Sequence, residues 1–211
     1  LMTDKRRPGS IFKMLPALFI ALFFGLSLVA AMLYPGGSQK DLTTSGFGWH
    51  ENYWCELLNP EAMNGKPNPG MPFGVIGMFC LGSAMSILFY LLPVYCPTTA
   101  GQQAIVRISS MLASFFACML FTGYHHPMLL GFSIFTFVTI LTTLIILAEG
   151  KQFRSFFSGL VVFLMVQINN VIYYLNWHKE ILPSFQKATI ILVVLWVLSL
   201  SLKFRDPTCP D

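Results

Sequence analysis

The sequence predicts an all-α polytopic membrane protein: six transmembrane helices, with a long ordered outer loop after the first. Three observations lead to this fold class. Hydrophobic residues make up 55% of the 211 residues and charged residues only 10%, whereas about a quarter of the residues in soluble domains are charged. Six apolar stretches each approach the ~20 residues that a helix needs to cross a bilayer. No stretch alternates apolar and polar residues as the strands of a membrane β-barrel do.

The predicted spans form a single domain over residues 1–211. They lie at residues 14–34, 72–92, 104–123, 128–148, 155–174 and 183–202. Phe, Leu, Ile and Val fill them, and a helix is the element that satisfies its own backbone groups in lipid. The first stretch follows three basic residues, as in a signal peptide, but it exceeds the apolar core of about 7–15 residues that signal peptides have. We therefore expect it to remain as an uncleaved first helix.

Lys and Arg are distributed unequally between the two sides that six spans create. Nine lie on the side of the termini (Lys5, Arg6, Arg7, Lys13, Arg107, Lys151, Arg154, Lys203 and Arg205), and four lie on the other side (Lys40, Lys66, Lys179 and Lys187). The positive-inside rule therefore places both termini in the cytoplasm. The outer side has no cysteine pair and the chain has no N-x-S/T sequon, which fits a bacterial inner membrane.

The predicted outer loop, residues 35–71, is the one long connection. It is rich in Gly, Pro and Asn, and it contains Trp49, Tyr53 and Trp54, which suit the headgroup zone of a membrane. Their i, i+4, i+5 spacing would put them on one side of a short interfacial helix. We expect this segment to fold over the outer mouth of the bundle.

Amides and a tyrosine lie on the outer half of the fifth span. Gln167, Asn170 and Tyr174 form one stripe, and Asn169 and Tyr173 form the adjacent pair. Because amides in lipid are costly without hydrogen bonds, they should face other helices. They either bond directly to groups such as Thr122, Ser133 or Thr136, or they border a pocket.

All four histidines also fall on the outer side, with His125 and His126 in the predicted tight turn before the fourth span. A pocket for a lipid or another hydrophobic ligand would then be bordered by Gln167, Asn170, Tyr174, His125, His126, Trp54 and Glu56. Zinc is the alternative ligand, because imidazole and carboxylate bind it and an open position would activate water. The candidate metal ligands are His126, His178, His50 and Glu51.

The block Glu51-Asn52-Tyr53-Trp54-Cys55-Glu56-Leu57-Leu58, followed by Asn64-Gly65, resembles the outer loop of the domain-of-unknown-function 998 family. With six helices and both ends inside, the chain is also similar, more distantly, to the DRAM/Frag/Sfk group. This resemblance implies an architecture and no catalytic residue. Trp54-Cys55-Glu56 is also similar to a short motif of alkaline ceramidases, which are zinc-dependent seven-helix hydrolases. The HxxxH pair that such enzymes carry near the C-terminus is missing here.

The sequence is compatible with three functions, of which only the second is enzymatic, so it does not decide whether the protein is an enzyme. The three alternatives are as follows. The protein binds membrane lipid at the outer leaflet, it is a metal-dependent hydrolase of a lipid-like substrate, or it is an accessory subunit of a membrane complex. In the last case a membrane-protein partner would dock on small residues of the second span such as Gly82 and Ser86. The alternative, which we favour for this pair, is ordinary packing inside the bundle. The composition excludes a nucleic-acid partner. The spans lack charged residues near their middle, which argues against a proton-coupled transporter.

Overall fold

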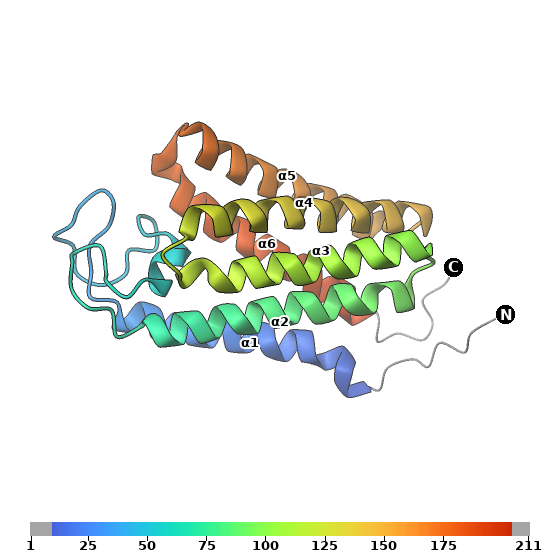
Figure 1. Cartoon of the computed structure of the whole chain (residues 1–211), viewed down its shortest axis with the longest axis horizontal. Coiled ribbons are helices and arrows are strands. Elements are labelled where there is room, and N and C mark those ends of the chain that lie inside the picture. Colours follow the sequence, from blue (N-terminus) through green and yellow to red (C-terminus); the bar gives the residue numbers. More distant parts are fainter. Residues whose placement is uncertain (1–9, 204–211) are drawn as a thin grey trace.

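A computed structural model of the chain describes residues 10–203. The six long helices are α1 (Ser10–Leu33), α2 (Met71–Tyr95), α3 (Ala100–Cys118), α4 (His125–Glu149), α5 (Phe153–Leu175) and α6 (Leu182–Lys203) (Figure 1). Three short 3₁₀ helices are η1 (Trp54–Leu58), η2 (Met119–Phe121) and η3 (Lys179–Ile181). The six long helices are long and apolar enough to cross a membrane. The predicted fold class is therefore confirmed, and the spans agree with the helices to within a few residues.

The helices form a ring. Each long helix packs against the next along the chain, and α6 also packs against α1, so the ring closes. The start of α1 and the end of α6 lie at the end of the bundle opposite the loop of residues 34–70 (Figure 1). Of the basic residues behind the predicted orientation, Lys5, Arg6, Arg7 and Arg205 lie outside the described residues.

Local sequence explains where several helices begin and end. Thr99 caps α3 in a capping box with Gln102, in which each side chain bonds the backbone N–H of the other residue. Asn176 ends α5 in the left-handed conformation, with φ at 59°, and Asn tolerates this conformation better than most residues. Pro72 and Pro183 lie in the first turns of α2 and α6. A proline is tolerated there because the first N–H groups of a helix have no acceptor within it.

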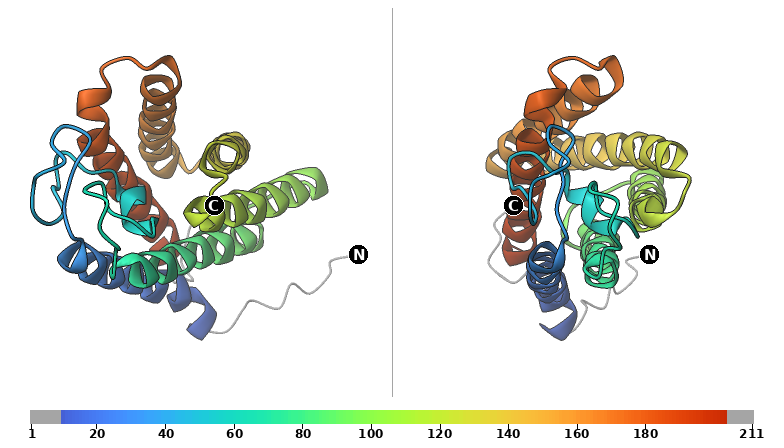
Figure 2. Two further views of the ribbon diagram at one scale, coloured as in Figure 1. Left: turned by 60° about the vertical axis from the view of Figure 1, so that its left-hand side comes forward. Right: turned by 90° about the vertical axis from the view of Figure 1, so that its left-hand side faces the viewer.

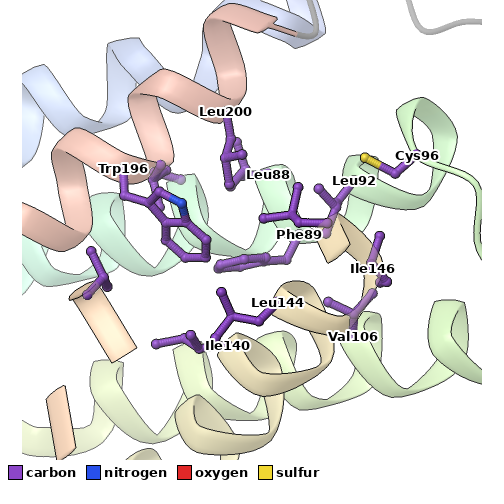
Figure 3. Close-up of a cluster of buried hydrophobic side chains, with 14 of the residues drawn as sticks. Leu88, Phe89, Leu92, Cys96, Val106, Ile140, Leu144, Ile146, Trp196 and Leu200 are labelled. Carbon is purple, nitrogen blue, oxygen red and sulfur yellow. The ribbon is translucent and has the colours of Figure 1, made fainter. Parts of the chain in front are cut away.

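The half of the ring on the side of the termini is filled by a hydrophobic core to which all six long helices contribute, and Figure 3 shows its members from α2, α3, α4 and α6. Phe89 and Trp196 face each other across it, with ring centroids 6.4 Å apart. The Trp196 indole donates a hydrogen bond to the Ser155 carbonyl at 3.1 Å. It packs so closely on α5 that a Cβ at Gly159 would lie 2.6 Å from its ring. This core closes the bundle on the side of the termini.

The small residues of α2 serve packing inside the bundle. Gly82 is buried, and a Cβ there would lie 2.9 Å from the Cys118 sulfur of α3. Gly82 therefore serves packing inside the bundle, as favoured from the sequence, and it is not available as a docking surface because α3 occupies that face. Ser86 is half-buried.

Candidate functional site: a cavity beneath the outer loop

The loop of residues 34–70 is folded back onto one end of the bundle (Figure 2). The distribution of Lys and Arg predicts that this is the outer end, and we use that name for it below. Its two arms are joined where Met63 N–H donates to the Tyr34 hydroxyl at 3.0 Å. Gly37 has a φ of 83° and lies so close to the second arm that a Cβ would be 2.4 Å from the nitrogen of Asn64. Only glycine fits this close approach with a positive φ. The expectation of an ordered loop that folds over one end of the bundle is confirmed.

Asn52 holds the centre of the loop together. Its side chain is fully buried, and its Oδ1 accepts a hydrogen bond from Gly48 N–H at 2.8 Å. Its Nδ2 donates to the Gly37 carbonyl at 2.8 Å and to the Glu56 carboxylate. The Asn52 amide thus joins the backbone at Gly37 to the backbone at Gly48 and also orients the Glu56 carboxylate. The loop is therefore held by specific hydrogen bonds as well as by burial.

Trp54 attaches the loop to two helices. Its indole Nε1 donates to Ser27 Oγ of α1 at 3.2 Å and its backbone N–H donates to Gln186 Oε1 of α6 at 3.0 Å. Its ring stacks on Phe23 of α1 at a centroid distance of 5.2 Å. Buried aromatic pairs of this kind contribute about 0.5–1.5 kcal/mol beyond the area that they bury.

The predicted interfacial helix is wrong in position and environment. The short helix begins at Trp54, after Trp49 and Tyr53, so the three aromatic residues do not share a helical face. Tyr53 packs with Ile172 and Leu182, whereas Trp54 packs with α1 and Trp49 stays 44% exposed. The loop buries the rings of Tyr53 and Trp54 in the bundle. The expectation that aromatic residues anchor in lipid headgroups does not predict this burial.

A buried lysine of α6 fastens the same segment. Lys187 is 8% exposed, and its Nζ donates to the carbonyls of Asn52 and Pro183. The ammonium group lies 5.4 Å from the centre of the Phe47 ring, which adds a cation–π contact. Glu56 supplies the negative charge near it, and each of the two charges stabilises the other.

Glu56 is the acid of the site and is only 4% exposed. Burial raises the pKa of this carboxyl group above its ordinary value, and the hydrogen bond from Asn52 and the charge of Lys187 offset part of that rise. Gln39 lies near enough to the carboxylate to favour its charged form. Even so, no hydrogen bond of normal geometry reaches Oε1 from the described residues.

Burial also raises the pKa values of two neighbours of Glu56, those of Tyr53 and Cys55, each to about 12. Both groups are therefore neutral near pH 7. A protonated thiol is a poor nucleophile, so Cys55 is a packing residue in this environment.

A cavity of about 570 Å³ lies inside the ring beneath the loop. Ligand sites commonly enclose about 300–1,000 Å³. The lining follows α4 from His125 to Ile140, a length of roughly 22 Å at 1.5 Å per residue. The cavity therefore reaches from the outer end past the middle of a hydrocarbon core that is about 30 Å thick.

The polar lining residues gather at the outer end. They come from the loop and from the outer turns of α4, α5 and α6, and include Gln39, Tyr53, Glu56, Asn59, His125, His126, Asn169, Asn170, Tyr173, Lys179 and Gln186. Among the described residues, the deeper wall has no charged side chain and no amide. It is formed by Met85, Phe89, Ile140, Val166, Val193 and Trp196, together with the hydroxyl residues Ser110, Thr136 and Thr139. Phe89, Ile140 and Trp196 also belong to the hydrophobic core, which forms the floor (Figure 3).

Of the seven residues predicted to border a pocket, the structure brings five to this cavity: Trp54, Glu56, His125, His126 and Asn170. The other two, Gln167 and Tyr174, are not among the lining residues, and Tyr174 is 46% exposed. Their neighbours Asn169 and Tyr173 line the cavity instead. The predicted stripe was therefore rotated by about one residue, which corresponds to 100° around a helix with 3.6 residues per turn.

The two adjacent asparagines of α5 have different environments. Asn170 Oδ1 accepts a hydrogen bond from Ser133 Oγ of α4 at 3.2 Å, which is the direct interhelical bond considered from sequence. Asn169 Oδ1 is buried and has no hydrogen-bond partner among the described residues. Both asparagines line the cavity, but only Asn170 makes a direct interhelical bond.

The histidines do not converge. His125 and His126 form the first turn of α4 rather than the tight turn that the sequence predicted, because the helix begins before Pro127. A proline at N3 is compatible with this start, since the first N–H groups of a helix have no partner inside it. His126 Nδ1 lies 3.3 Å from the Tyr173 hydroxyl.

The remaining candidate metal ligands have separate partners. His178 Nδ1 lies 3.0 Å from Glu180, His50 Nδ1 lies 3.4 Å from Ser184 Oγ, and Glu51 accepts a hydrogen bond from Ser38. Within the part of the chain that the structure describes, no group of three or more His, Cys, Asp or Glu could hold a metal ion. The predicted zinc ligands are therefore not brought together.

Two residues that organise the site were missed from sequence. Lys187 was counted as an outer basic residue and Asn52 only as part of the resemblance. The available signal was the position of Lys187 inside the sixth span, because a cation there must find buried partners. Nothing in the spacing of Asn52 distinguishes it from other loop asparagines.

No protein-family model, no curated protein and no solved structure matches this chain.

Proposed function

We propose that this protein is an integral membrane protein that binds a single-chain amphiphile in the cavity beneath its outer loop. The observation that carries this proposal is the distribution of polarity along one continuous cavity. Polar side chains cluster where the loop meets the bundle, and the deep wall ends in Phe89, Ile140 and Trp196. An amphiphile has the same two ends, so its chain would lie along α4 and its head would lie near Glu56.

The size of the cavity supports one chain rather than a whole bilayer lipid. A volume of about 570 Å³ lies within the range of sites for small molecules. The ordered loop, held by Trp54 and Lys187, would separate the head group from the outer aqueous phase.

The orientation belongs to this proposal. We place both termini in the cytoplasm and the loop on the outer side of a bacterial inner membrane. The support is the excess of Lys and Arg on the side of the termini and the lack of outer cysteine pairs and sequons.

Trp196 allows a direct test, because it lies at the deep end of the cavity. A single-chain amphiphile brominated near the end of its chain should quench the fluorescence of Trp196 with a saturable dependence on concentration. The matched control is the variant Trp196→Phe, which should lose the saturable component. Trp177 is 62% exposed and would report only the gradual quenching caused by probe in the surrounding micelle or bilayer.

Chain length gives a second readout in the same assay. Each buried CH₂ contributes about 0.8 kcal/mol, so affinity should rise about fourfold per added carbon until the cavity is filled. Quenching that never saturates, or that is the same in Trp196→Phe, would refute the proposal.

A further inference from the structure

Two buried oxygen atoms in the lining of the cavity lack hydrogen-bond donors. They are Glu56 Oε1, on the loop, and Asn169 Oδ1, on α5, and neither has a partner among the described residues. Both residues line the same cavity, and Glu56 is 4% exposed. Buried polar atoms in folded proteins are nearly always hydrogen-bonded, so such exceptions at a cavity point to a missing partner.

Both atoms are acceptors, and this restricts the missing partner to a donor. A carboxylate and an amide oxygen can receive a hydrogen bond from a hydroxyl or an ammonium group. They cannot be satisfied by an ester carbonyl or by the oxygens of an ionised phosphate, which are acceptors themselves. The head group that fits must therefore carry donors.

The charges already present favour a neutral donor. Lys187 supplies a buried positive charge close to Glu56, and its ammonium group is held by the carbonyls of Asn52 and Pro183. A cationic head would add a second positive charge, with Lys179 also in the lining. An anionic head would place a negative charge against Glu56. A hydroxylated head satisfies the acceptors without an uncompensated buried charge.

We propose that the cavity selects neutral amphiphiles whose head group carries hydroxyl groups, which donate to Glu56 Oε1 and Asn169 Oδ1. The chemical class is that of a monoacylglycerol, with one acyl chain and a free diol. This inference rests on the proposed binding of a single-chain amphiphile and adds the chemistry of the head group to it.

The test measures how four probes with one common chain compete with the brominated probe at Trp196. The probes are a monoacylglycerol, the methyl ester of the same fatty acid, the corresponding primary alkylamine and the corresponding lysophosphatidic acid. The monoacylglycerol should bind about tenfold or more tightly than the methyl ester, since two hydrogen bonds separate the two. It should also bind more tightly than the amine and the anion.

Adjacent asparagines provide the variant and its control. Asn169→Ala removes one free acceptor and should reduce the preference for monoacylglycerol over methyl ester severalfold. Asn170→Ala removes an amide whose Oδ1 already accepts from Ser133, and it should keep the preference. If Asn169→Ala does not fold, the ranking of the four probes on the unaltered protein still decides the question.

Each outcome has a defined meaning. Equal binding of monoacylglycerol and methyl ester overturns the selectivity while leaving the proposed function in place. Tighter binding of the amine or of the lysophosphatidic acid overturns the neutral head and identifies a charged one. Absence of saturable quenching of Trp196 by the brominated amphiphile refutes the proposed function itself.

Discussion

The indole Nε1 of Trp54 donates a hydrogen bond to the hydroxyl of Ser27 at 3.2 Å, which ties the loop of residues 34–70 to α1. The same indole stacks on Phe23. A residue in a connecting loop therefore forms part of the buried core of the bundle, and the position of the loop depends on it.

Two variants of Trp54 should separate the stability contributed by its hydrogen bond to Ser27 from that contributed by its ring. Trp54→Phe keeps an aromatic ring on Phe23 but loses the hydrogen bond, so the free energy of unfolding should fall by about 1 kcal/mol. Trp54→Ala also removes the ring and should cost about 3–5 kcal/mol. Equilibrium unfolding in detergent would measure both. Equal losses for the two variants would show that the ring contributes nothing.

The contact between the loop and α2 should depend on Gly74. A Cβ at this position would lie 2.6 Å from the carbonyl oxygen of Leu57, and that backbone cannot move without displacing η1. Gly74→Ala should therefore lower the free energy of unfolding by about 1–3 kcal/mol. The matched control is Gly25→Ala in α1, where a Cβ meets nothing within 4 Å. Thermal unfolding should separate the two variants, and similar melting temperatures would contradict the close approach.

The stability of the protein should depend on pH through Glu56. Burial raises its pKa in the folded state, so the folded protein keeps this proton to a higher pH than the unfolded chain does. The protonated carboxyl group therefore contributes stability that is fully present below the ordinary pKa of glutamate. This contribution is lost as the pH rises through the raised pKa of the folded state.

The variant Glu56→Gln isolates this effect, because glutamine does not titrate. Relative to Glu56→Gln, the wild-type protein should lose stability as the pH rises from the ordinary pKa of glutamate, about 4.3, through the raised pKa of the folded protein. A difference that does not change with pH, or that changes in favour of the wild type, would be inconsistent with a raised pKa.

The proposed orientation predicts which sites react with a membrane-impermeant thiol reagent added to intact cells. Lys40→Cys lies at an exposed loop position and should be labelled from outside. Ala100→Cys lies at the exposed start of α3, at the opposite end of the bundle, and should be labelled only after the membrane is opened. The unaltered protein gives the background from native cysteines. The reverse pattern would invert the orientation.

The sequence predicted the number, type and approximate limits of the six helices, because length and apolar content alone decide them. It also located the polar end of the bundle from residues such as Asn170 and His126. It placed the polar stripe of α5 one residue too far around the helix. The cost of an amide without hydrogen bonds in lipid requires it to face other helices, but it does not say which of two neighbouring faces of α5 does so. Gln167 and Asn169 cannot be separated without knowing where α4 lies.

The interior of the loop was not predictable in the same way. The burial of Lys187 and the attachment of the Trp54 backbone to Gln186 arise from contacts across more than a hundred residues. The bonds of the Asn52 side chain are local, but nothing in its spacing marks it among the asparagines of the loop. Headgroup anchoring of aromatic residues is a general tendency of membrane proteins. It was overridden here by the hydrogen bond to Ser27 and by stacking on Phe23.

The central claim is that the cavity holds an amphiphile, and mass spectrometry of what co-purifies with the protein tests it most directly. The wild-type protein should retain about one single-chain amphiphile per chain after purification in a mild detergent. Ala113→Phe, which puts a ring into the cavity lining, should lose it, and Ile108→Phe, on the exposed face of the same helix, should retain it. A wild-type protein that carries no bound amphiphile, or an Ala113→Phe variant that retains as much as Ile108→Phe, would contradict the account.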